Sequence, residues 1–251
     1  MTKSPPSAEH FDDWYTKLNE SDKVEQIAID NLGLPQGFES SSLLSWDGIA
    51  VLADALRVGP ADVLVDLACG RGSYGIEIAR RTGAQLVGVD FSAVAIERAR
   101  LKSATAQFVV GELAATGLDA ESASAVLCID AMQFADPYEA GLRECLRILR
   151  PGGRLVLTGW QAHDLADEQV PARMRYDMAA EFASAGFVDA RVQDRPDWRA
   201  AELAYWRAAT QLDPEGDPGA ASLRGEGEGL LPMLERTSRV LATARKPEDG
   251  A

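Results

Sequence analysis

The chain has 251 residues, enough for one α/β domain with additions, and its 46% hydrophobic and 25% charged residues are ordinary for a globular protein. Its 25 basic and 39 acidic residues give a net charge of −14, which argues against nucleic acid or an anionic membrane as the main partner. No apolar run has the length of a signal-peptide core or of a membrane span, so we expect a cytoplasmic protein.

The N-terminal part predicts helices. Residues 1–22 are polar but include Phe11, Trp14 and Tyr15, which favours a loose start and a short amphipathic helix. Three serines at 40–42 precede an apolar segment that predicts a capped helix to about residue 56. We therefore treat residues 1–45 as an N-terminal helical segment, and 46–251 as the main domain.

The middle of the chain alternates between strands and helices. Strands are predicted at 63–68, 85–90, 107–112, 125–130 and 154–160, and helices at 73–81, 92–102 and 138–150. Asp136 and Pro137 suit the N-cap and first turn of the last of these helices. This alternation predicts an α/β fold with a doubly wound, mostly parallel, Rossmann-like sheet.

The C-terminal part has a different pattern. It predicts a helix at 173–185, a strand at 187–193, two helices at 198–211 and 220–236, and a closing strand at 239–245. We interpret residues 198–236 as a helical insertion. The stretch 213–229 between and within its helices is rich in Gly, Pro and Glu, which predicts a mobile loop.

A glycine-rich turn follows the first predicted strand. Gly70, Gly72 and Gly75 form a G-x-G-x-x-G pattern, which suits a dinucleotide but is weak evidence on its own. Asp66 ends the strand beside this turn, and its repulsion of a pyrophosphate would cost about 1–4 kcal/mol per charge pair. S-adenosylmethionine has no phosphate and carries a sulfonium and an ammonium, so an acidic neighbour attracts it. Asp90, at the end of the next strand, suits a ribose diol with either cofactor.

Three stretches together strengthen this choice: VDLACGRGSYG from residue 65, VGVDFS from residue 87 and RILRPGGRLVLT from residue 147. In this order they resemble the class I S-adenosylmethionine-dependent methyltransferases, and most closely the small-molecule branch related to the quinone-biosynthesis C-methylases. The resemblance covers roughly residues 45–160. It implies a seven-stranded sheet whose last strand is antiparallel.

The resemblance also implies roles for single residues. Asp66, Ala68, Gly70 and Gly72 would hold the methionine end, Asp90 the ribose and Phe91 the adenine face, and Glu112 or Leu113 would reach the adenine edge. The family usually has Asp where Glu112 stands, which leaves open whether side chain or backbone makes that contact. Asp130 would lie at the carboxyl end of the fourth strand, where open α/β sheets bind ligands. The alternatives are a turn-capping Asp66, a core Phe91 and a solvated Glu112.

The acceptor site is less well defined by the sequence. We expect contacts from Tyr15, Met132, Gln133 and Trp160, and we consider His163 as a general base, or else as a loop histidine in solvent. Further aromatic residues line either this pocket or the helix core: Trp14, Trp46, Tyr176, Trp198, Tyr205 and Trp206. The first twenty residues and the 198–236 insertion would form a lid over Met132, Trp160 and His163, or pack as fixed helices.

The sequence therefore predicts methyl transfer from S-adenosylmethionine to a small-molecule acceptor, as in bacterial natural-product metabolism, by a monomer or homodimer. Two alternatives stay open: a macromolecular acceptor, and a cofactor-binding cyclase or regulator that transfers no methyl group. The three cysteines and two histidines show no metal-ligand spacing, so we expect reduced thiols and no metal site.

Overall fold

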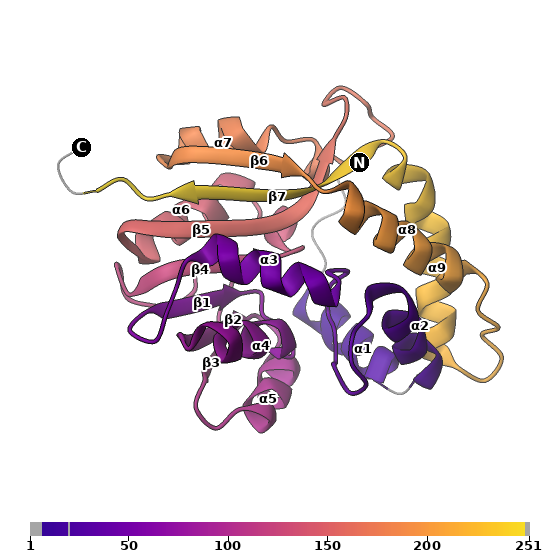
Figure 1. Cartoon of the computed structure of the whole chain (residues 1–251). Coiled ribbons are helices and arrows are strands. Elements are labelled where there is room, and N and C mark those ends of the chain that lie inside the picture. The colour runs from indigo at the N-terminus through magenta and orange to yellow at the C-terminus, as the bar shows by residue number, and fades with distance from the viewer. Residues whose placement is uncertain (1–6, 20, 249–251) are drawn as a thin grey trace.

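The computed structural model describes residues 7–19 and 21–248, and its centre is a seven-stranded sheet with the order β3-β2-β1-β4-β5-β7-β6 (Figure 1). The strands are β1 (Val63–Leu67), β2 (Gln85–Asp90), β3 (Gln107–Val110), β4 (Ala123–Ile129), β5 (Leu149–Ala162), β6 (Val188–Asp194) and β7 (Thr237–Arg245). Neighbours among β1 to β5 pair in parallel, and β7 runs antiparallel to both β5 and β6. The predicted fold class is confirmed.

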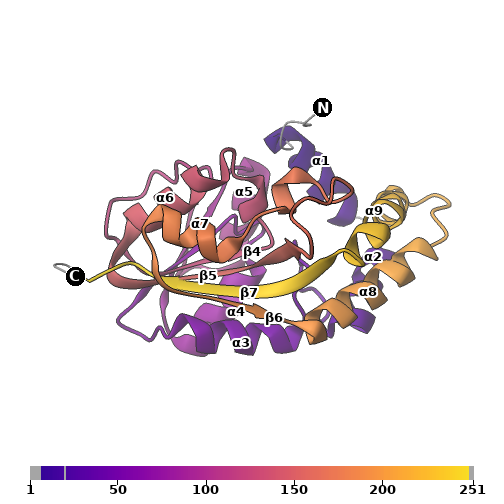
Figure 2. The same cartoon turned by 90° about the horizontal axis from the view of Figure 1, so that it is seen from above.

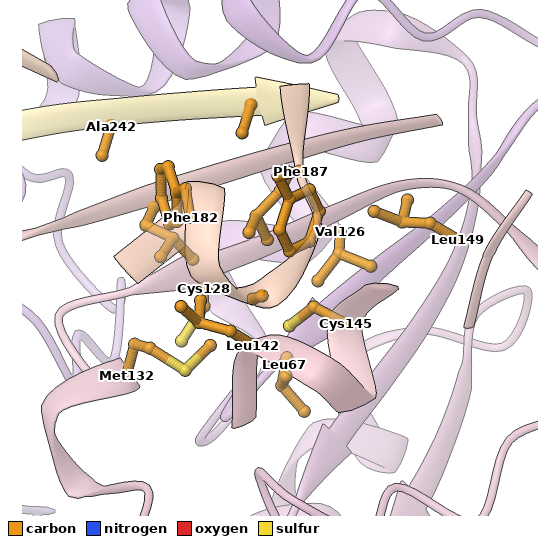
Figure 3. Close-up of a cluster of buried hydrophobic side chains, with 14 of the residues drawn as sticks. Leu67, Val126, Cys128, Met132, Leu142, Cys145, Leu149, Phe182, Phe187 and Ala242 are labelled. Atoms are coloured by element: carbon orange, nitrogen blue, oxygen red, sulfur yellow. The ribbon is translucent and has the colours of Figure 1, made fainter. Parts of the chain in front are cut away.

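Helices cover both faces of the sheet (Figure 2). On one face lie α3 (Trp46–Leu56), α4 (Ser73–Thr82) and α5 (Ala93–Lys102), and on the other lie α6 (Tyr138–Ile148) and α7 (Met178–Ala185). The side chains of β4 alternate between the two cores: Val126 and Cys128 pack with α6 and α7, and Leu127 packs with α3 and α4. Figure 3 shows the first of these cores, around Leu142 and Phe182.

Four helices form a separate group, which we call the cap. They are α1 (Ala8–Asn19), α2 (Asp22–Leu32), α8 (Pro196–Thr210) and α9 (Pro218–Leu234), and they lie beyond the end of the sheet at which β7 begins (Figure 1). Because β7 is antiparallel to β5, this is the carboxyl end of the parallel strands. A third hydrophobic core, with Leu32, Trp206 and Leu223, holds α2, α8 and α9 together.

The predicted loop at 213–229 is wrong, because α9 begins at Pro218 and runs through most of it. The Asp217 side chain accepts a hydrogen bond from the Ala220 N–H at 2.9 Å, and Pro218 occupies the first turn. Two of the glycines permit close packing: a Cβ at Gly219 would come within 2.6 Å of the Lys17 carbonyl oxygen, and one at Gly227 within 3.2 Å of that of Trp206. These two glycines thus serve helix packing. Between α8 and α9, only residues 211–217 lie outside a helix.

Some element boundaries also differ from expectation. The predicted helix at 173–185 begins as a short 3-10 turn (Ala172–Met174), and α7 starts only after Asp177, whose side chain caps it. The N-cap of α6 is Pro137 instead of Asp136, and no side chain caps it. No helix within the described residues is long and apolar enough to cross a membrane. Cys69, Cys128 and Cys145 are all free and buried.

Candidate functional site

The glycine turn leaves β1 and enters α4 through three residues with positive φ: Ala68 at 59°, Gly70 at 53° and Gly72 at 77°. This left-handed backbone favours glycine. Close packing adds a second reason at Gly70, where a Cβ would come within 2.5 Å of the Ser41 Oγ and 2.8 Å of the Tyr15 Oη. Strand β2 anchors the turn, since the Gly70 N–H donates to the Asp90 Oδ2 at 2.8 Å. The turn is therefore a fixed backbone cradle.

Asp66 lies at the base of this turn and is 2% exposed. A Cβ at Gly75 would come within 2.5 Å of its Oδ2, so the third glycine of the pattern lets α4 approach the carboxyl group. Burial, and then the nearby charge of Asp90, raise the pKa of Asp66 to about 8, although a hydrogen bond from the Gly75 backbone lowers it. A cation bound beside Asp66 would favour its charged form.

Asp90 ends β2 and is also buried. Its Oδ1 accepts from the Ser92 N–H at 2.9 Å and its Oδ2 from Gly70, so each oxygen keeps a lone pair for a further donor such as a ribose hydroxyl. Burial raises its pKa, and these backbone hydrogen bonds oppose the rise. Phe91, the next residue, is half-buried and meets the Phe11 ring edge to face, with centroids 5.5 Å apart.

Helix α1 covers these loops. Besides the contact between Phe11 and Phe91, the Asp12 carboxylate accepts a hydrogen bond from the Ser92 hydroxyl. Tyr15 is 5% exposed and lies against Gly70, and its pKa is raised by burial and by the charge of Asp90. Tyr15, predicted as an acceptor contact, thus lies at the cofactor loop and is not among the residues that line the large cavity described next.

A cavity of about 1020 Å³ lies between the cap and the carboxyl end of the sheet. From the sheet side, Asp130, Gln133 and Trp160 line it, as predicted residues of the site. The cap contributes most of the apolar and aromatic wall, and Met174 of the 3-10 turn before α7 adds to it. The cap residues are Trp14, Leu32, Tyr205, Trp206, Leu223, Leu230 and Met233. Its size and its mostly apolar wall suit a small organic molecule.

A buried charged cluster forms one wall of the cavity. Arg239 on β7 is 0% exposed and donates to both oxygens of Asp130, at 2.5 and 2.7 Å. Its Nε lies 3.1 Å from the Glu202 Oε2, and the guanidinium lies over the Trp160 ring, 4.3 Å from the centroid. Burial alone would raise the pKa of Asp130, but Arg239 and the hydroxyls of Ser42 and Thr158 lower it.

Sequence reasoning missed Glu202 and Arg239. Glu202 lies in a helix that was predicted only as an insertion, and Arg239 opens the apolar stretch RVLATAR. Arg245 at the other end of the same stretch is part-exposed and pairs with the exposed Asp189, so no local pattern distinguishes the buried Arg239 from it. The partner of Arg239, Asp130, is 109 residues away in sequence, so only the fold identifies it.

Other predicted residues lie away from the cavity. Met132 is 2% exposed and packs beside Cys128 and Leu142 in the core (Figure 3). His163 is exposed just beyond β5, where its backbone N–H donates to the Arg236 carbonyl at 2.9 Å, and it does not line the cavity. Glu112 is exposed in a tight turn with Ala115, and Leu113 is half-buried against the core of α6 and α7.

Known sequences resemble the middle of this chain. Residues 65–157 match the family model described as a methyltransferase domain. Demethylmenaquinone methyltransferases of Deinococcus radiodurans and Beutenbergia cavernae are 39% identical over 114 residues and 34% identical over 104 residues. The first match covers 43% of this chain and 46% of the relative, and the second covers 41% and 43%. The chain therefore spans less than half the length of the curated relatives it matches.

Solved structures share the fold over nearly the whole chain. The [4+2]-cyclase SpnF matches with a TM-score of 0.74 at 18% identity, over 99% of this chain and 100% of that one. Geranyl diphosphate C-methyltransferase from Streptomyces coelicolor A3(2), in complex with S-adenosyl-L-homocysteine, matches with a TM-score of 0.70 at 18% identity, over 97% and 100%. With the glycine turn and the strand order, the match identifies residues 65–157 as a methyltransferase domain of the class I S-adenosylmethionine-dependent type.

Proposed function

We propose that this protein transfers a methyl group from S-adenosylmethionine to a small molecule held in the cavity under the cap. The observation that carries the proposal is the buried carboxyl group of Asp66 at the base of the glycine turn. A pyrophosphate at this turn would oppose the ionisation of Asp66, whereas the sulfonium and ammonium of S-adenosylmethionine would be attracted to its carboxylate.

The residues of the turn fit this cofactor. The backbone from Ala68 to Gly72 forms a left-handed turn in which Ser41 and Tyr15 pack directly against Gly70, and Asp66 lies at its base for the methionine end. Asp90 retains lone pairs for the ribose diol, and Phe91 suits one face of the adenine. Glu112 or the backbone of Leu113 would reach the adenine edge. The cofactor supplies an activated methyl group, so the protein mainly has to align the acceptor and exclude water.

The cap supports the second half of the proposal. It encloses the cavity with apolar side chains, and Asp130, Gln133 and Trp160 connect that cavity to the carboxyl end of the sheet. The names of similar proteins give demethylmenaquinone, a sterol and geranyl diphosphate as their acceptors, and all three are small molecules. We extend the proposal to a small acceptor of natural-product metabolism, and to a cytoplasmic monomer or homodimer. His163 has no contact with the cavity, so the proposal assigns it no part in proton transfer.

A second candidate function is a reaction that uses the cofactor-binding fold without methyl transfer. The structural match to a [4+2]-cyclase over almost the whole of both chains favours it. The two candidates differ in their products, because only methyl transfer converts S-adenosylmethionine to S-adenosylhomocysteine.

The test has two stages. Calorimetry should show that S-adenosylhomocysteine binds and that NAD does not, and micromolar NAD binding without heat from S-adenosylhomocysteine would contradict the proposal. A panel of quinols, phenols, polyketides and amines is then incubated with methyl-labelled S-adenosylmethionine. Label transferred to an acceptor, with one S-adenosylhomocysteine formed per methyl group, is the expected result. An acceptor converted with no S-adenosylhomocysteine formed would establish the second function instead.

A further inference from the structure

Glu202 is a carboxyl group buried in the wall of the acceptor cavity. It is 1% exposed, yet it lines the cavity from α8. The indole N–H of Trp160 lies 3.0 Å from both of its oxygens, and that of Trp206 lies 3.4 Å from its Oε1. Two tryptophans of the cavity wall therefore direct their N–H groups at one carboxylate.

The charges around this carboxylate do not cancel. Arg239 is shared between Asp130 and Glu202, so one positive charge faces two negative ones. Another cavity cation of low exposure, Arg71, is directed elsewhere: its Nη2 donates to the Ser40 carbonyl at 2.6 Å and its guanidinium lies over the Tyr15 ring. Burial raises the pKa of Glu202, and the charge of Arg239 opposes that rise. With both carboxyl groups ionised, the cluster has one more negative than positive charge next to the cavity.

The same arrangement occurs a second time in the wall. Glu226 on α9 accepts a hydrogen bond from the Trp14 indole at 2.7 Å, and both residues line the cavity. The remaining charged residues of the wall also include more acids than bases: Asp13, Asp22, Glu25 and Glu39 against Lys17, Arg98 and Arg173. The formal charge of the side chains that line the cavity is therefore negative.

A hydrogen bond from an indole N–H to a carboxylate increases the electron density of the ring. The face of such a ring attracts cations more strongly, and tryptophan is already the best of the aromatic side chains for this contact. Trp160 shows the effect within the protein, since the Arg239 guanidinium lies 4.3 Å from its centroid. Acidic groups behind aromatic rings are what recognition of an organic cation requires.

We propose that the acceptor is a largely apolar molecule with a positively charged amine or ammonium group, which binds beside Glu202 and the indoles of Trp160 and Trp206. This inference rests on the proposed function, because it names the class of molecule that the same cavity takes. A neutral acceptor would leave the excess charge of the cluster without a partner in a site of low dielectric constant. A cationic group compensates it.

Three ten-carbon probes test the charge preference in the presence of saturating S-adenosylhomocysteine: decyltrimethylammonium, decanol and decanoate, each below its micelle concentration. Calorimetry should show the cation binding at least about tenfold more tightly than the alcohol, and the carboxylate binding most weakly. Equal affinities for cation and alcohol, or tighter binding of the alcohol, would overturn the proposal.

Two variants locate the preference. Glu202→Gln, which keeps the size and the hydrogen-bond acceptor oxygen, should reduce the ratio of cation to alcohol affinity to less than about threefold. Asp13→Asn removes one charge at the exposed rim and should keep the ratio, since solvent screens it. A ratio that Glu202→Gln leaves unchanged, or that Asp13→Asn reduces equally, would contradict the role of Glu202.

The affinity for S-adenosylhomocysteine is measured first in every variant. If the protein binds S-adenosylhomocysteine but shows no charge preference, only the inference about a cationic acceptor is contradicted. If it prefers the cation but does not bind S-adenosylhomocysteine, the proposed methyl transfer is contradicted. Glu202→Asp provides a further check on folding, because it keeps the charge and should restore part of the preference that Glu202→Gln removes.

Discussion

At the scale of single residues, the role proposed for Asp66 predicts that cofactor binding depends on pH. Its pKa of about 8, raised by burial and by Asp90, means that the free protein holds it largely protonated at neutral pH. A bound cation favours the ionised form, so binding releases a proton and strengthens as the pH rises towards 8. Between pH 7.5 and 5.5 the dissociation constant for S-adenosylmethionine should increase at least about tenfold. In Asp66→Asn this dependence should largely disappear, and calorimetry across the range decides it.

The same group affects the stability of the ligand-free protein in the opposite sense. Because the folded-state pKa lies above the ordinary value of 3.8, the proton on Asp66 stabilises the folded state fully below that value. This contribution is lost as the pH rises through about 8. Urea unfolding of the free protein should therefore show a free energy that falls between pH 5 and 8 more steeply than in Asp66→Asn. Parallel curves for the two proteins would refute the assignment.

Asp90 gives a second prediction for a single residue. Asp90→Ala removes hydrogen-bond acceptors for the ribose and also the anchor of the Gly70 N–H. S-adenosylhomocysteine should bind about 1.5–3 kcal/mol more weakly by calorimetry, the range expected for hydrogen bonds to a charged group. Asp90→Asn keeps an oxygen for one of these bonds and should lose less. An unchanged dissociation constant in a folded Asp90→Ala protein would mean that the ribose is held elsewhere.

At the scale of elements, α1 connects the loop after β2 to helix α9. Phe11 and Asp12 contact the loop after β2, and Trp14 donates to Glu226 on α9. A helix of 12 residues is marginal by itself, so these contacts keep it in place over the cofactor loop. Burial raises the pKa of Glu226, and the Trp14 hydrogen bond opposes that rise by favouring the carboxylate.

Trp14→Phe should therefore loosen α1. We expect amide hydrogen exchange in residues 9–17 to accelerate about threefold or more, because the variant removes the Trp14 donor and leaves the part-buried Glu226 only the longer contact with the Ser222 hydroxyl at 3.5 Å. Lys17→Ala, which removes only an exposed ion pair of the same helix, should exchange at the wild-type rate. If α1 acts as the predicted lid, S-adenosylhomocysteine with an acceptor slows the exchange. Identical rates with and without these ligands would show instead that α1 is a fixed helix.

The sequence predicted the elements with strong local signals. The strands from β1 to β5 are apolar runs between turn residues, and the parallel sheet follows from their alternation with helices. Helix α2 lies in the segment 1–45 that was predicted to be helical, but it was not predicted as a separate element, although Ser21 caps it and Gly33 ends it. For α9 the local composition was misleading, since two of its glycines, Gly219 and Gly227, serve packing against α1 and α8. Burial and pairing, as at Arg239 and Glu202, depend on contacts across the fold and have no local signal.

At the scale of the whole molecule, Arg239 joins the cap to the sheet. It lies on β7 and holds Asp130 after β4 and Glu202 on α8, all of them buried. The pKa of Asp130 is lowered, chiefly by Arg239 acting against burial, so its part of the stability is present above the ordinary value of 3.8 and is lost as the pH falls through the lower folded-state pKa. The Asp130 part of the cluster thus stabilises the contact between the cap and the sheet at neutral pH and weakens in acid, whereas burial raises the pKa of Glu202.

Arg239→Gln leaves two buried carboxyl groups without their common cation. The free energy of unfolding at pH 7 should fall by about 3–5 kcal/mol, the cost of breaking a buried ion pair on one side only. Arg245→Gln, on the same strand, breaks pairs with the exposed Asp189 and Glu248 and should cost less than about 1 kcal/mol. Because the charge on Asp130 and Glu202 causes the loss, lowering the pH from 7 to 5 should recover part of the stability of Arg239→Gln relative to the wild type, as burial favours their protonated forms. Urea unfolding at both pH values measures the free energy of unfolding of Arg239→Gln and of the wild type. A difference between these two free energies that is small at pH 7, or that grows in acid, would contradict the role of Arg239 as the central cation of the cluster.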